Sequence, residues 1–590
     1  MLNINYVPFF LFLQLYVTCD EHKHVFDYII VGSGPAGSVI ANRISKLLSL
    51  KVLMLEAGEL PPLMSQVPLY PLNLARTSVD WNFTTIPSRT IAQGLKNRQN
   101  RIIAGKALGG STALNFNLFV RGNKRDYDNW ARHGAIGWDW KSVFPYFLKL
   151  EDNRDYHIVR NGYHGVGGNV VIQTPPFHSP ITEGYLKAAI EIGYGNGDFN
   201  AEPQAVFQPE QGTIDRRGCW GALQAYINPV RGRRNLWILT SAFVHKILIQ
   251  NKYAYGVKFE HRGQTYEAYA KHEVIISAGV FNSPKLLMLS GIGPKRTLEK
   301  FDIPIVADLP VGRNLQEQPS TSGMTFAAKS YTYSTERITV LDYNKFLVNG
   351  TGPLTSLGGI DTIGFVNSKY NDDPGWPDIE MLWFSLSAAS DNGAVLRHAA
   401  NLKEEVWKKM FEPFISIDTI ACFPYPTRPK SRGFVTIRSS DPHDDPLIDL
   451  KFYSNPYDLK IIVEGLKYCL KMASTEAMRK FGVYPLPVSV PGCEHYKRFT
   501  DEYLACVATT LPFTVYHYCG SCKMGSVADP TTVVDPTLKV KGVEGLRVAD
   551  ASIIPFVVTG HLNIPTYMIG EKAADMILSD LLHKHKHEHK

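Results

Sequence analysis

Apolar and polar positions near the start of the chain predict a strand, a helix and a second strand. Residues 26–31, FDYIIV, form an apolar run rich in β-branched side chains, as in a buried strand. Residues 38–47, SVIANRISKL, carry apolar side chains at helical spacing, and residues 51–55, KVLML, form a second apolar run. This order predicts a βαβ unit.

Three glycines mark the turn between the first strand and the helix. Gly32, Gly34 and Gly37 have the spacing G-x-G-x-x-G, which allows a tight bend, close approach of a pyrophosphate to the backbone, and close packing of helix on strand. The N–H groups and dipole at the start of the helix favour phosphate binding. Glu56 lies 19 residues after Gly37, where a carboxylate can accept hydrogen bonds from an adenosine ribose. The unit predicts a dinucleotide site and leaves NAD and FAD open.

Length and composition predict a folded protein of two domains. The 590 residues exceed one ordinary core, and 44% of them are hydrophobic and 20% charged. The runs DIEMLWFSL (378–386) and FVTIRSS (434–440) predict strands of a second sheet. The net charge of +7 is small and spread along the chain, so we expect no nucleic-acid function.

The N-terminal segment predicts secretion. Residues 7–17 are apolar but too few to span a bilayer, and residues 17–19 suit a cleavage site, so we expect a signal peptide at 1–19. No other segment looks transmembrane, and no membrane association is expected. Asn82 and Asn349 begin sequons for glycosylation.

Eight cysteines are too few for a disulfide scaffold. Removing residues 1–19 leaves seven, so at least one thiol is free or paired with another chain. Cys493 and Cys506, close in sequence, are a candidate pair. The tail at 583–590, HKHKHEHK, could bind metal loosely through alternating histidines, but a solvated, disordered end is favoured.

The segment YHYCGSCKMG (516–525) leaves three chemistries open: a redox dithiol, part of a metal site, or an acid/base histidine. A redox Cys-x-x-Cys normally sits where a strand meets a helix N-terminus, whereas this one lies between an apolar run and a Gly-Ser turn. A metal site would need further ligands at fixed spacing, and no second Cys-x-x-Cys is present. We therefore predict no metal site, and an acid/base role of the histidine, His517, stays open at this point.

Several other segments resemble signatures of the glucose-methanol-choline (GMC) family of flavoenzymes. They are RIIAGKALGGSTALNFNLFVRGNKRDYDNWA (101–131), SAGVFNSPKLLMLSGIGP (277–294), DLPVGRNLQEQP (308–319), LRVADASIIP (546–555) and HLNIPTYMIGEKAADMI (561–577). Val280 is bulkier than the family's usual residue at its position. The resemblance covers residues 26 to about 582, and GPLTSLGGIDTIGFVNSKY (352–370) resembles the secreted arthropod branch, which includes glucose dehydrogenase-like, alcohol oxidase and mandelonitrile oxidase-like proteins.

The resemblance implies an α/β (mixed α+β) fold, in which a Rossmann-like FAD-binding domain is interleaved with a substrate domain built on a large antiparallel sheet. The FAD-binding domain would comprise residues 25–60, 95–175, 225–320 and 535–585, with 61–94 as a flap over FAD. The substrate domain would comprise residues 176–224 and 320–534.

The resemblance also implies the cofactor site and its residues. The predicted FAD-binding residues are Gly32, Ser33, Gly34, Pro35, Ala36, Gly37, Glu56, Ala57, Trp81, Leu108, Gly109, Gly110, Asn115, Val244, Asp550, Ala551, Asn563 and Thr566. Some family members attach FAD covalently through a histidine, but Leu114 stands at the matching position here. We therefore predict noncovalent FAD.

His517 matches the acid/base histidine of the family, and His561, 44 residues later, matches its second active-site position. Transfer of a hydride from an alcohol carbon to flavin N5 requires loss of the hydroxyl proton, and a positioned base contributes about 10²–10⁴-fold. We expect His517 to take this proton and His561 to hold the oxygen by hydrogen bonding.

The predicted function is oxidation of the CH–OH group of a small-molecule alcohol, with oxygen (oxidase) or a quinone (dehydrogenase) as electron acceptor. A flavin-containing hydroxynitrile lyase of the same fold is the alternative, and a binding protein without catalysis is disfavoured by the two histidines. The substrate stays open, with an aromatic alcohol or a cyanohydrin among the candidates, and the oligomeric state also stays open. Four aromatic residues could line the substrate pocket or belong to the core: Trp383, Phe384, Tyr516 and Phe556.

Overall fold

The computed structural model describes residues 24–216 and 218–588. The predicted signal peptide at 1–19 lies outside these residues. Within the described part of the chain, no helix is long and apolar enough to cross a membrane.

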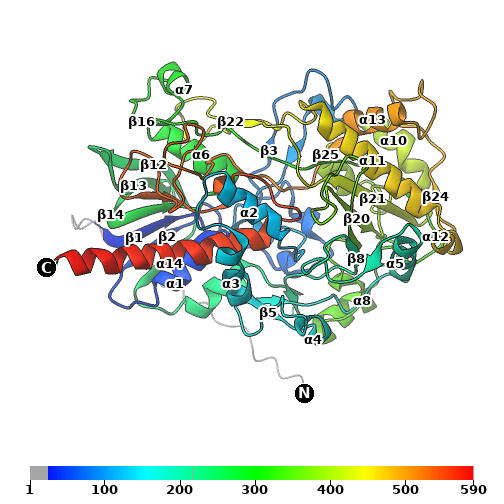
Figure 1. Cartoon of the computed structure of the whole chain (residues 1–590), viewed down its shortest axis with the longest axis horizontal. Helices are drawn as coiled ribbons and strands as arrows, with labels where there is room; N and C mark the ends of the chain where they lie inside the picture. Colours follow the sequence, from blue (N-terminus) through cyan, green and yellow to red (C-terminus); the bar gives the residue numbers. More distant parts are fainter. Residues whose placement is uncertain (1–23, 217, 589–590) are drawn as a thin grey trace.

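The first sheet has seven strands and includes β1 and β2, which lie side by side (Figure 1). Its order is β11 (Leu236–Leu239), β2 (Val52–Leu55), β1 (Val25–Val31), β14 (Gln264–Ile276), β13 (Tyr253–His261) and β12 (Ala242–Gln250), with β26 (Leu546–Val548) also beside β14. β11, β2, β1, β14 and β26 pair in parallel, whereas β12, β13 and β14 form an antiparallel meander. Helix α1 (Pro35–Ile44) connects β1 to β2, which confirms the predicted βαβ unit.

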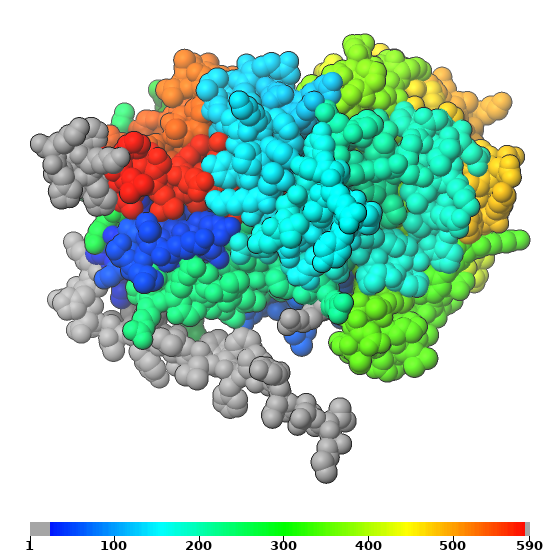
Figure 2. Space-filling view, turned by 60° about the horizontal axis from the view of Figure 1, so that its bottom comes forward, coloured from blue at the N-terminus to red at the C-terminus, as the bar shows by residue number. Residues whose placement is uncertain are grey.

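Segments from both ends of the chain build this part of the molecule. Helix α14 (Asn563–Glu588) packs along α1 and also contacts α3 (Trp140–Leu150). Figure 2 shows the N-terminal segments in blue beside the C-terminal segments in red. α14 continues to Glu588, so the tail predicted to be disordered from residue 583 is helical as far as residue 588. Residues 583–588 contain no glycine or proline, and each added residue gains a hydrogen bond once a helix is anchored.

The second sheet is large and almost entirely antiparallel. Its order is β24 (Tyr484–Pro485), β18 (Thr325–Ala327), β21 (Thr419–Pro426), β20 (Ile379–Phe384), β19 (Ile360–Val366), β8 (Val206–Gln208) and β7 (Gly195–Asn196). Only β7 and β8 pair in parallel. Helix α11 (Pro456–Ala473) packs on β20 and β21, and α13 (Asp501–Thr510) and α5 (Thr182–Glu191) pack against α11 (Figure 1). The two sheets confirm the predicted fold.

Alternation along β20 separates two faces of the second sheet. Met381 and Trp383 pack in the core beneath α11, whereas Leu382 and Phe384 pack on the other side of the sheet. Successive side chains of a strand point to opposite faces, so this division follows from the register. Trp383 is therefore core.

Two sequence expectations differ from the structure. The run FVTIRSS was expected in the large sheet, but β22 (Phe434–Thr436) pairs with β23 (Leu447–Asp449) in a separate two-stranded sheet packed on α6 (Gly279–Leu289). Residues 320–534 were assigned to the substrate domain, but Cys519, Cys522 and Val534 pack in the core of the first sheet. The chain must return through that core to reach β26.

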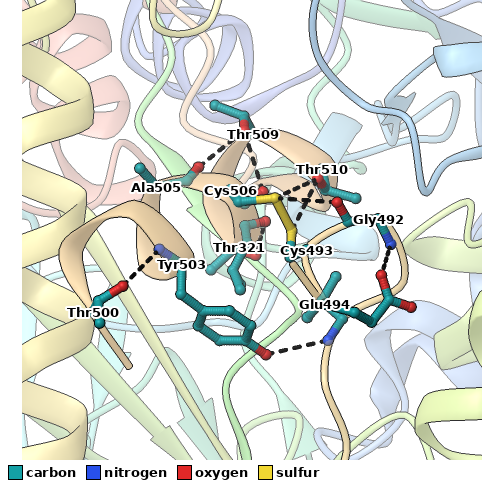
Figure 3. Close-up of a disulfide and its surroundings, with 12 residues drawn as sticks. Thr321, Gly492, Cys493, Glu494, Thr500, Tyr503, Ala505, Cys506, Thr509 and Thr510 are labelled. Atoms are coloured by element: carbon teal, nitrogen blue, oxygen red, sulfur yellow. Dashed lines mark hydrogen bonds between the residues drawn. A yellow bond between two sulfur atoms is a disulfide. The ribbon is translucent and has the colours of Figure 1, made fainter. Parts of the chain in front are cut away.

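Two disulfides lie in the part of the molecule around the second sheet. Cys493–Cys506 confirms the candidate pair and ties a loop to α13, whose N-terminus is capped by Thr500 (Figure 3). Cys422–Cys469 joins β21 to α11. Among the described cysteines, Cys219, Cys519 and Cys522 are free and buried.

The remaining elements connect these layers. The strands are β3 (Phe83–Thr84), β4 (Arg101–Ile102), β5 (Glu151–Asn153), β6 (Val170–Ile172), β9 (Ile214–Asp215), β10 (Gly218–Cys219), β15 (Ile292–Gly293), β16 (Ala307–Asp308), β17 (Pro319–Thr321) and β25 (Pro512–Thr514). The helices are α2 (Lys124–Arg132), α4 (Tyr156–Val159), α7 (Lys295–Lys300), α8 (Val340–Asn344), α9 (Leu396–Ala399), α10 (Glu404–Met410) and α12 (Glu476–Lys480).

Candidate active site

A long cavity brings together nearly all of the predicted site residues. The predicted residues that line it are Gly32, Ser33, Gly34, Pro35, Ala36, Glu56, Ala57, Trp81, Gly110, Asn115, Val244, His517, Asp550, Ala551, His561, Asn563 and Thr566. Gly37, Leu108 and Gly109 do not line it. Gly37 lies inside α1, where a Cβ would come 2.1 Å from the carbonyl oxygen of Gly32, so it acts through helix packing. Leu108 is buried, and the N–H of Gly109 donates to Ser33 Oγ at 3.1 Å.

The glycine turn leaves room beside the start of α1. Gly32 has a φ of 100°, and a Cβ there would lie 2.3 Å from the carbonyl oxygen of Ser277, so only glycine fits. A Cβ on Gly34 would meet no atom within 4 Å, since this residue faces the open cavity. The N-terminus of α1 therefore has unobstructed backbone for a phosphate group.

Glu56 directly follows β2 and also lines the cavity. Its Oε2 accepts hydrogen bonds from the N–H and Oγ of Ser33, at 3.0 and 2.6 Å, and its Oε1 accepts from the N–H of Gly58 at 2.9 Å. Burial raises the pKa of the Glu56 carboxyl, and the hydrogen bonds from Ser33 and Gly58 oppose that rise. The side chain is thus held in one orientation with acceptor capacity left for a ribose hydroxyl.

The C-terminal segment supplies polar groups to the middle of the cavity. Asp550 accepts hydrogen bonds from the N–H of Gly279 and from Ser283 Oγ, at 2.9 and 2.6 Å. The side-chain amide of Asn563 is buried, and neither of its polar atoms has a hydrogen-bond partner among the described residues. A buried amide without a partner costs free energy, so a ligand with donors and acceptors suits this position. The lining fits an adenine dinucleotide that extends from Glu56 towards the histidines.

His517 and His561 face each other at the far end of the cavity. Their ring centroids are 4.4 Å apart, and His517 Nε2 lies 3.1 Å from His561 Nδ1. His517 follows β25, whereas His561 precedes α14, so segments distant in sequence bring the two rings together. A substrate hydroxyl placed against these two nitrogens can contact both rings.

Gln318 determines which nitrogen of His517 carries the proton. The Gln318 amide nitrogen donates to the carbonyl oxygens of Thr427 and Val558, at 2.7 and 3.0 Å, so its oxygen faces His517 Nδ1 at 2.6 Å. The neutral imidazole therefore donates from Nδ1 and keeps its lone pair on Nε2. Burial, together with the positive charge that His561 can carry, lowers the pKa of His517 well below its usual range. The His517 ring is therefore uncharged at neutral pH, and its Nε2 lone pair is available to act as a base.

Glu380 and Tyr425 hold the other histidine. His561 Nε2 lies 2.8 Å from Glu380 Oε1 and 3.3 Å from Tyr425 Oη. Glu380 on β20 and Tyr425 on β21 are paired across the two strands, so one sheet position supplies both contacts. Sequence reasoning missed Glu380. The available signal was an acidic residue inside the otherwise apolar strand DIEMLWFSL.

A second buried acid lies beside the pair without touching either ring. Glu317 Oε1 accepts from the N–H groups of Gln318 and Val515, at 3.1 and 3.3 Å. Burial raises the pKa of Glu317 to about 8, so the carboxyl is mostly protonated at neutral pH. The two buried glutamates therefore differ in their partners, and only Glu380 contacts a histidine ring.

Five aromatic side chains form a closed ring in the lining of the cavity, called here the aromatic ring. They are Phe116, Phe384, Phe423, Phe513 and Tyr516. Neighbours around it have centroids 5.0 to 6.5 Å apart, in the order just given, and Tyr516 returns to Phe116. Of the four aromatic residues proposed from the sequence, Phe384 and Tyr516 line the cavity, whereas Trp383 and Phe556 do not.

The Cys-x-x-Cys beside His517 is part of the structural surroundings. Cys519 and Cys522 are fully buried, and burial raises the pKa of both thiols, opposite to the lowered pKa of a reactive cysteine. The N–H of Cys522 donates to the carbonyl oxygen of Ser552 at 2.7 Å, next to Asp550. The geometry favours a packing role. The sequon residues Asn82 and Asn349 are both exposed, although Phe83, the middle residue of the first sequon, lines the cavity.

Comparisons with known proteins agree with this geometry. Residues 26–320 match the N-terminal part, and residues 429–570 the C-terminal part, of the GMC oxidoreductase family. The chain belongs to the GMC oxidoreductase family. It is similar to glucose dehydrogenase [FAD, quinone] of Drosophila pseudoobscura pseudoobscura, with 33% identity over 563 residues that cover 95% of this chain and 87% of that protein. It is also similar to ecdysone oxidase of Spodoptera littoralis, with 32% identity over 557 residues that cover 94% and 91%.

A solved structure supports the same conclusion. The fold is similar to that of pyridoxine 4-oxidase from Mesorbium loti, with a TM-score of 0.78, 26% identity and coverage of 93% of this chain and 98% of that one. Family membership confirms the predicted cofactor, FAD, and identifies the chain as an FAD-dependent oxidoreductase acting on alcohol-type donors. Leu114 lines the cavity where some family members carry a linking histidine, so FAD is held without a covalent bond.

Proposed function

We propose that this protein is a secreted oxidoreductase that oxidises an aromatic alcohol, with His517 as the base. The observation that carries the proposal is the aromatic ring in the same cavity as the paired histidines. Aromatic side chains bind an aromatic group through offset and edge contacts worth about 0.5–1.5 kcal/mol each beyond area burial. The division into a cofactor domain and a substrate domain on the second sheet belongs to the same proposal.

The aromatic ring disfavours a sugar. Each sugar hydroxyl that loses its water contacts needs a hydrogen-bond partner, and an unmade bond costs about 1–3 kcal/mol. The five side chains of the aromatic ring offer a single hydroxyl, that of Tyr516, and this hydroxyl has no hydrogen-bond partner among the described residues. A substrate with one apolar aromatic body and one hydroxyl near the histidines matches these groups.

His517 and His561 have different roles toward the substrate hydroxyl. Bound FAD supplies the acceptor for the hydride that leaves the carbinol carbon. His517 Nε2, which carries the lone pair of the ring, takes the hydroxyl proton, and Gln318 holds the resulting imidazolium in place at 2.6 Å. His561 contacts the oxygen through Nδ1, and Glu380 keeps that ring oriented at 2.8 Å. Loss of the proton as the hydride leaves avoids a positively charged carbonyl product.

Three features support secretion. The chain begins with an apolar segment of the length and position of a signal peptide, residues 7–17. The described residues include two disulfides, and disulfides persist in oxidising compartments. Asn82 and Asn349 are exposed, as glycan acceptors must be. Mass spectrometry of the protein from culture medium tests cleavage and glycosylation directly.

The test is anaerobic mixing of the holoenzyme with a panel of benzylic alcohols, sugars, choline and cyanohydrins, followed by loss of the flavin absorbance. We expect benzylic alcohols to reduce the flavin fastest, and His517→Ala to slow that step by about 10²–10⁴-fold. His133→Ala, an exposed histidine outside the cavity lining, is the matched control and should match the parent.

Several outcomes would contradict the proposal. A sugar as the best substrate would refute the role of the aromatic ring, and cleavage of a cyanohydrin without flavin bleaching would indicate a lyase. Parallel assays of peroxide formation and of quinone-dye reduction identify the electron acceptor. A rate of flavin reduction in His517→Ala within a few-fold of the parent would refute the role of His517.

A further inference from the structure

We propose that His245, Glu260 and His443 form a binding site for one divalent transition metal ion such as Zn²⁺. His245 lies on β12, Glu260 lies on β13, and His443 lies in the loop between β22 and β23, called here the metal loop (residues 437–446). The spacing of these residues gives no motif in the sequence, which predicted no metal site. The three side chains meet only in the folded chain.

The ligand atoms are at distances that suit one shared ion. Glu260 Oε2 lies 3.6 Å from His245 Nε2 and 3.5 Å from His443 Nε2, and all three atoms lie within 4.8 Å of one another. Zinc binds nitrogen and carboxylate oxygen at about 2.0–2.2 Å in a tetrahedral arrangement, which places neighbouring ligand atoms roughly 3.4 Å apart. Only the separation of the two histidine nitrogens must shorten.

The same distances are poor for direct hydrogen bonds. His164 contacts Glu151 and Asp198 at 2.7 and 2.8 Å, as hydrogen-bonded histidine–carboxylate pairs do. In contrast, His245 Nε2 is buried, and no hydrogen bond to it is present among the described residues. A buried ring nitrogen directed at a carboxylate, but too far for a bond, suits a metal ion between the two.

The surrounding residues hold the three ligands in place. His245 and Glu260 project from adjacent antiparallel strands, so the sheet sets their separation. Phe243 packs against both histidine rings, with centroids 5.4 Å from His245 and 5.3 Å from His443. Asp441 Oδ1 accepts from the N–H of His443 at 2.9 Å and orders the metal loop. The site needs little rearrangement to close on an ion.

The ligand set indicates the class of metal. Two imidazoles and one carboxylate favour Zn²⁺ or Cu²⁺ over Ca²⁺ and Mg²⁺, which prefer oxygen ligands. The His443 side chain is 57% exposed, so solvent can supply the fourth ligand. Binding of the ion forms bonds between the ligand atoms and the metal, and no group is oxidised or reduced.

The position of the site indicates its consequence. Pro442, next to His443, lines the cofactor cavity, as do Phe243 and Val244 beside His245. A metal ion would therefore connect the metal loop to the first sheet beside Val244, one of the predicted FAD-binding residues in the cavity. We expect the bound ion to slow the release of FAD.

The experiment uses the full-length holoenzyme in which the tail histidines are replaced by glutamine, because they could bind metal themselves: His583, His585, His587 and His589. The protein is treated with EDTA, dialysed, and titrated with ZnCl₂ by calorimetry. We expect one ion per chain in this parent, and at least about 100-fold weaker binding in the same protein with His443→Ala, since even outer-shell changes cost 10–100-fold. His157→Ala, another exposed histidine, is the control and should bind as the parent does.

A second measurement follows FAD release by flavin fluorescence after dilution, with and without ZnCl₂. We expect zinc to slow release in the parent and in His157→Ala, and to have no effect in His443→Ala. Absence of one-to-one binding in the parent, or equal binding in His443→Ala, would overturn the site. One-to-one binding that leaves FAD release unchanged would overturn the connection to the cofactor. His443 is exposed, so its replacement leaves the core intact.

Discussion

Replacement of Glu380 by glutamine tests whether this buried acid assists catalysis through His561. Glutamine has nearly the same shape as glutamate, so the packing of β20 is preserved while the negative charge is removed. In the parent, Glu380 Oε1 lies 2.8 Å from His561 Nε2, and the Glu380 side chain is completely buried. We expect slower flavin reduction with little change in substrate KM.

The size of the effect follows from the type of hydrogen bond. A hydrogen bond to a charged group contributes about 1.5–3 kcal/mol, whereas a neutral bond contributes about 0.5–1.5 kcal/mol. The loss of about 1–2 kcal/mol corresponds to a rate decrease of about 5- to 30-fold, since 1.36 kcal/mol is tenfold. The loss appears in the rate of flavin reduction and not in substrate binding. The negative charge of Glu380 stabilises His561 while His561 contacts the substrate oxygen, which becomes negative in the transition state.

The assay is stopped-flow flavin reduction under anaerobic conditions with the best alcohol of the panel, at several pH values. Glu317→Gln is the matched control. Glu317 is also buried, but its carboxyl contacts backbone N–H groups instead of a histidine ring, and its pKa of about 8 keeps it mostly neutral at pH 7. We expect Glu317→Gln to reduce flavin at nearly the rate of the parent, because the glutamine oxygen can accept the same two backbone hydrogen bonds.

A double variant provides the sharper test. If Glu380 acts through His561, then Glu380→Gln adds no further slowing to His561→Ala, because the ring it holds is already absent. Fully additive effects in the double variant would refute this reasoning. An unchanged rate in Glu380→Gln alone would refute it as well.

Five further predictions follow from the structure. Because burial lowers the pKa of His517, the rate of flavin reduction is expected to stay constant above pH 6.5 and to fall only at lower pH; a decline beginning above pH 7 would contradict the assignment. The same lowered pKa means that below pH 6.5 the unfolded chain binds a proton that the folded chain does not, so stability decreases as the pH is lowered. His517→Gln should therefore lose less stability than the parent between pH 7 and pH 5 in urea titrations. The Cys493→Ser/Cys506→Ser variant removes a cross-link between residues 13 apart and is expected to lower the free energy of unfolding by about 2–4 kcal/mol, seen as a lower Tm. Phe384→Ala removes two edge contacts of the aromatic ring and is expected to lower kcat/KM for a benzylic alcohol by about tenfold, with no comparable loss for a small aliphatic alcohol. Acid precipitation should release the yellow colour from the protein, because Leu114 provides no covalent link.

Local sequence patterns predicted the features that depend on neighbouring residues. The strand, turn and helix around Gly32 follow from periodicity and from the need for glycine at a positive φ. The two histidines came from resemblance, and the structure places their rings 4.4 Å apart. The expected sheet position of residues 434–440 was wrong, because a short apolar run does not show which strand it pairs with.

The sequence by itself determined the cofactor turn and the family, and it predicted the two histidines of the site, since each of these rests on residues close together in the chain. Only the tertiary structure decided what surrounds them. Gln318 and Glu380 reach the histidine rings because distant strands pair in one register, and the aromatic ring is assembled from residues that lie far apart in sequence. The candidate metal ligands on β12, β13 and the metal loop meet for the same reason. Side-chain contacts between distant segments depend on packing and register, and no local pattern encodes them.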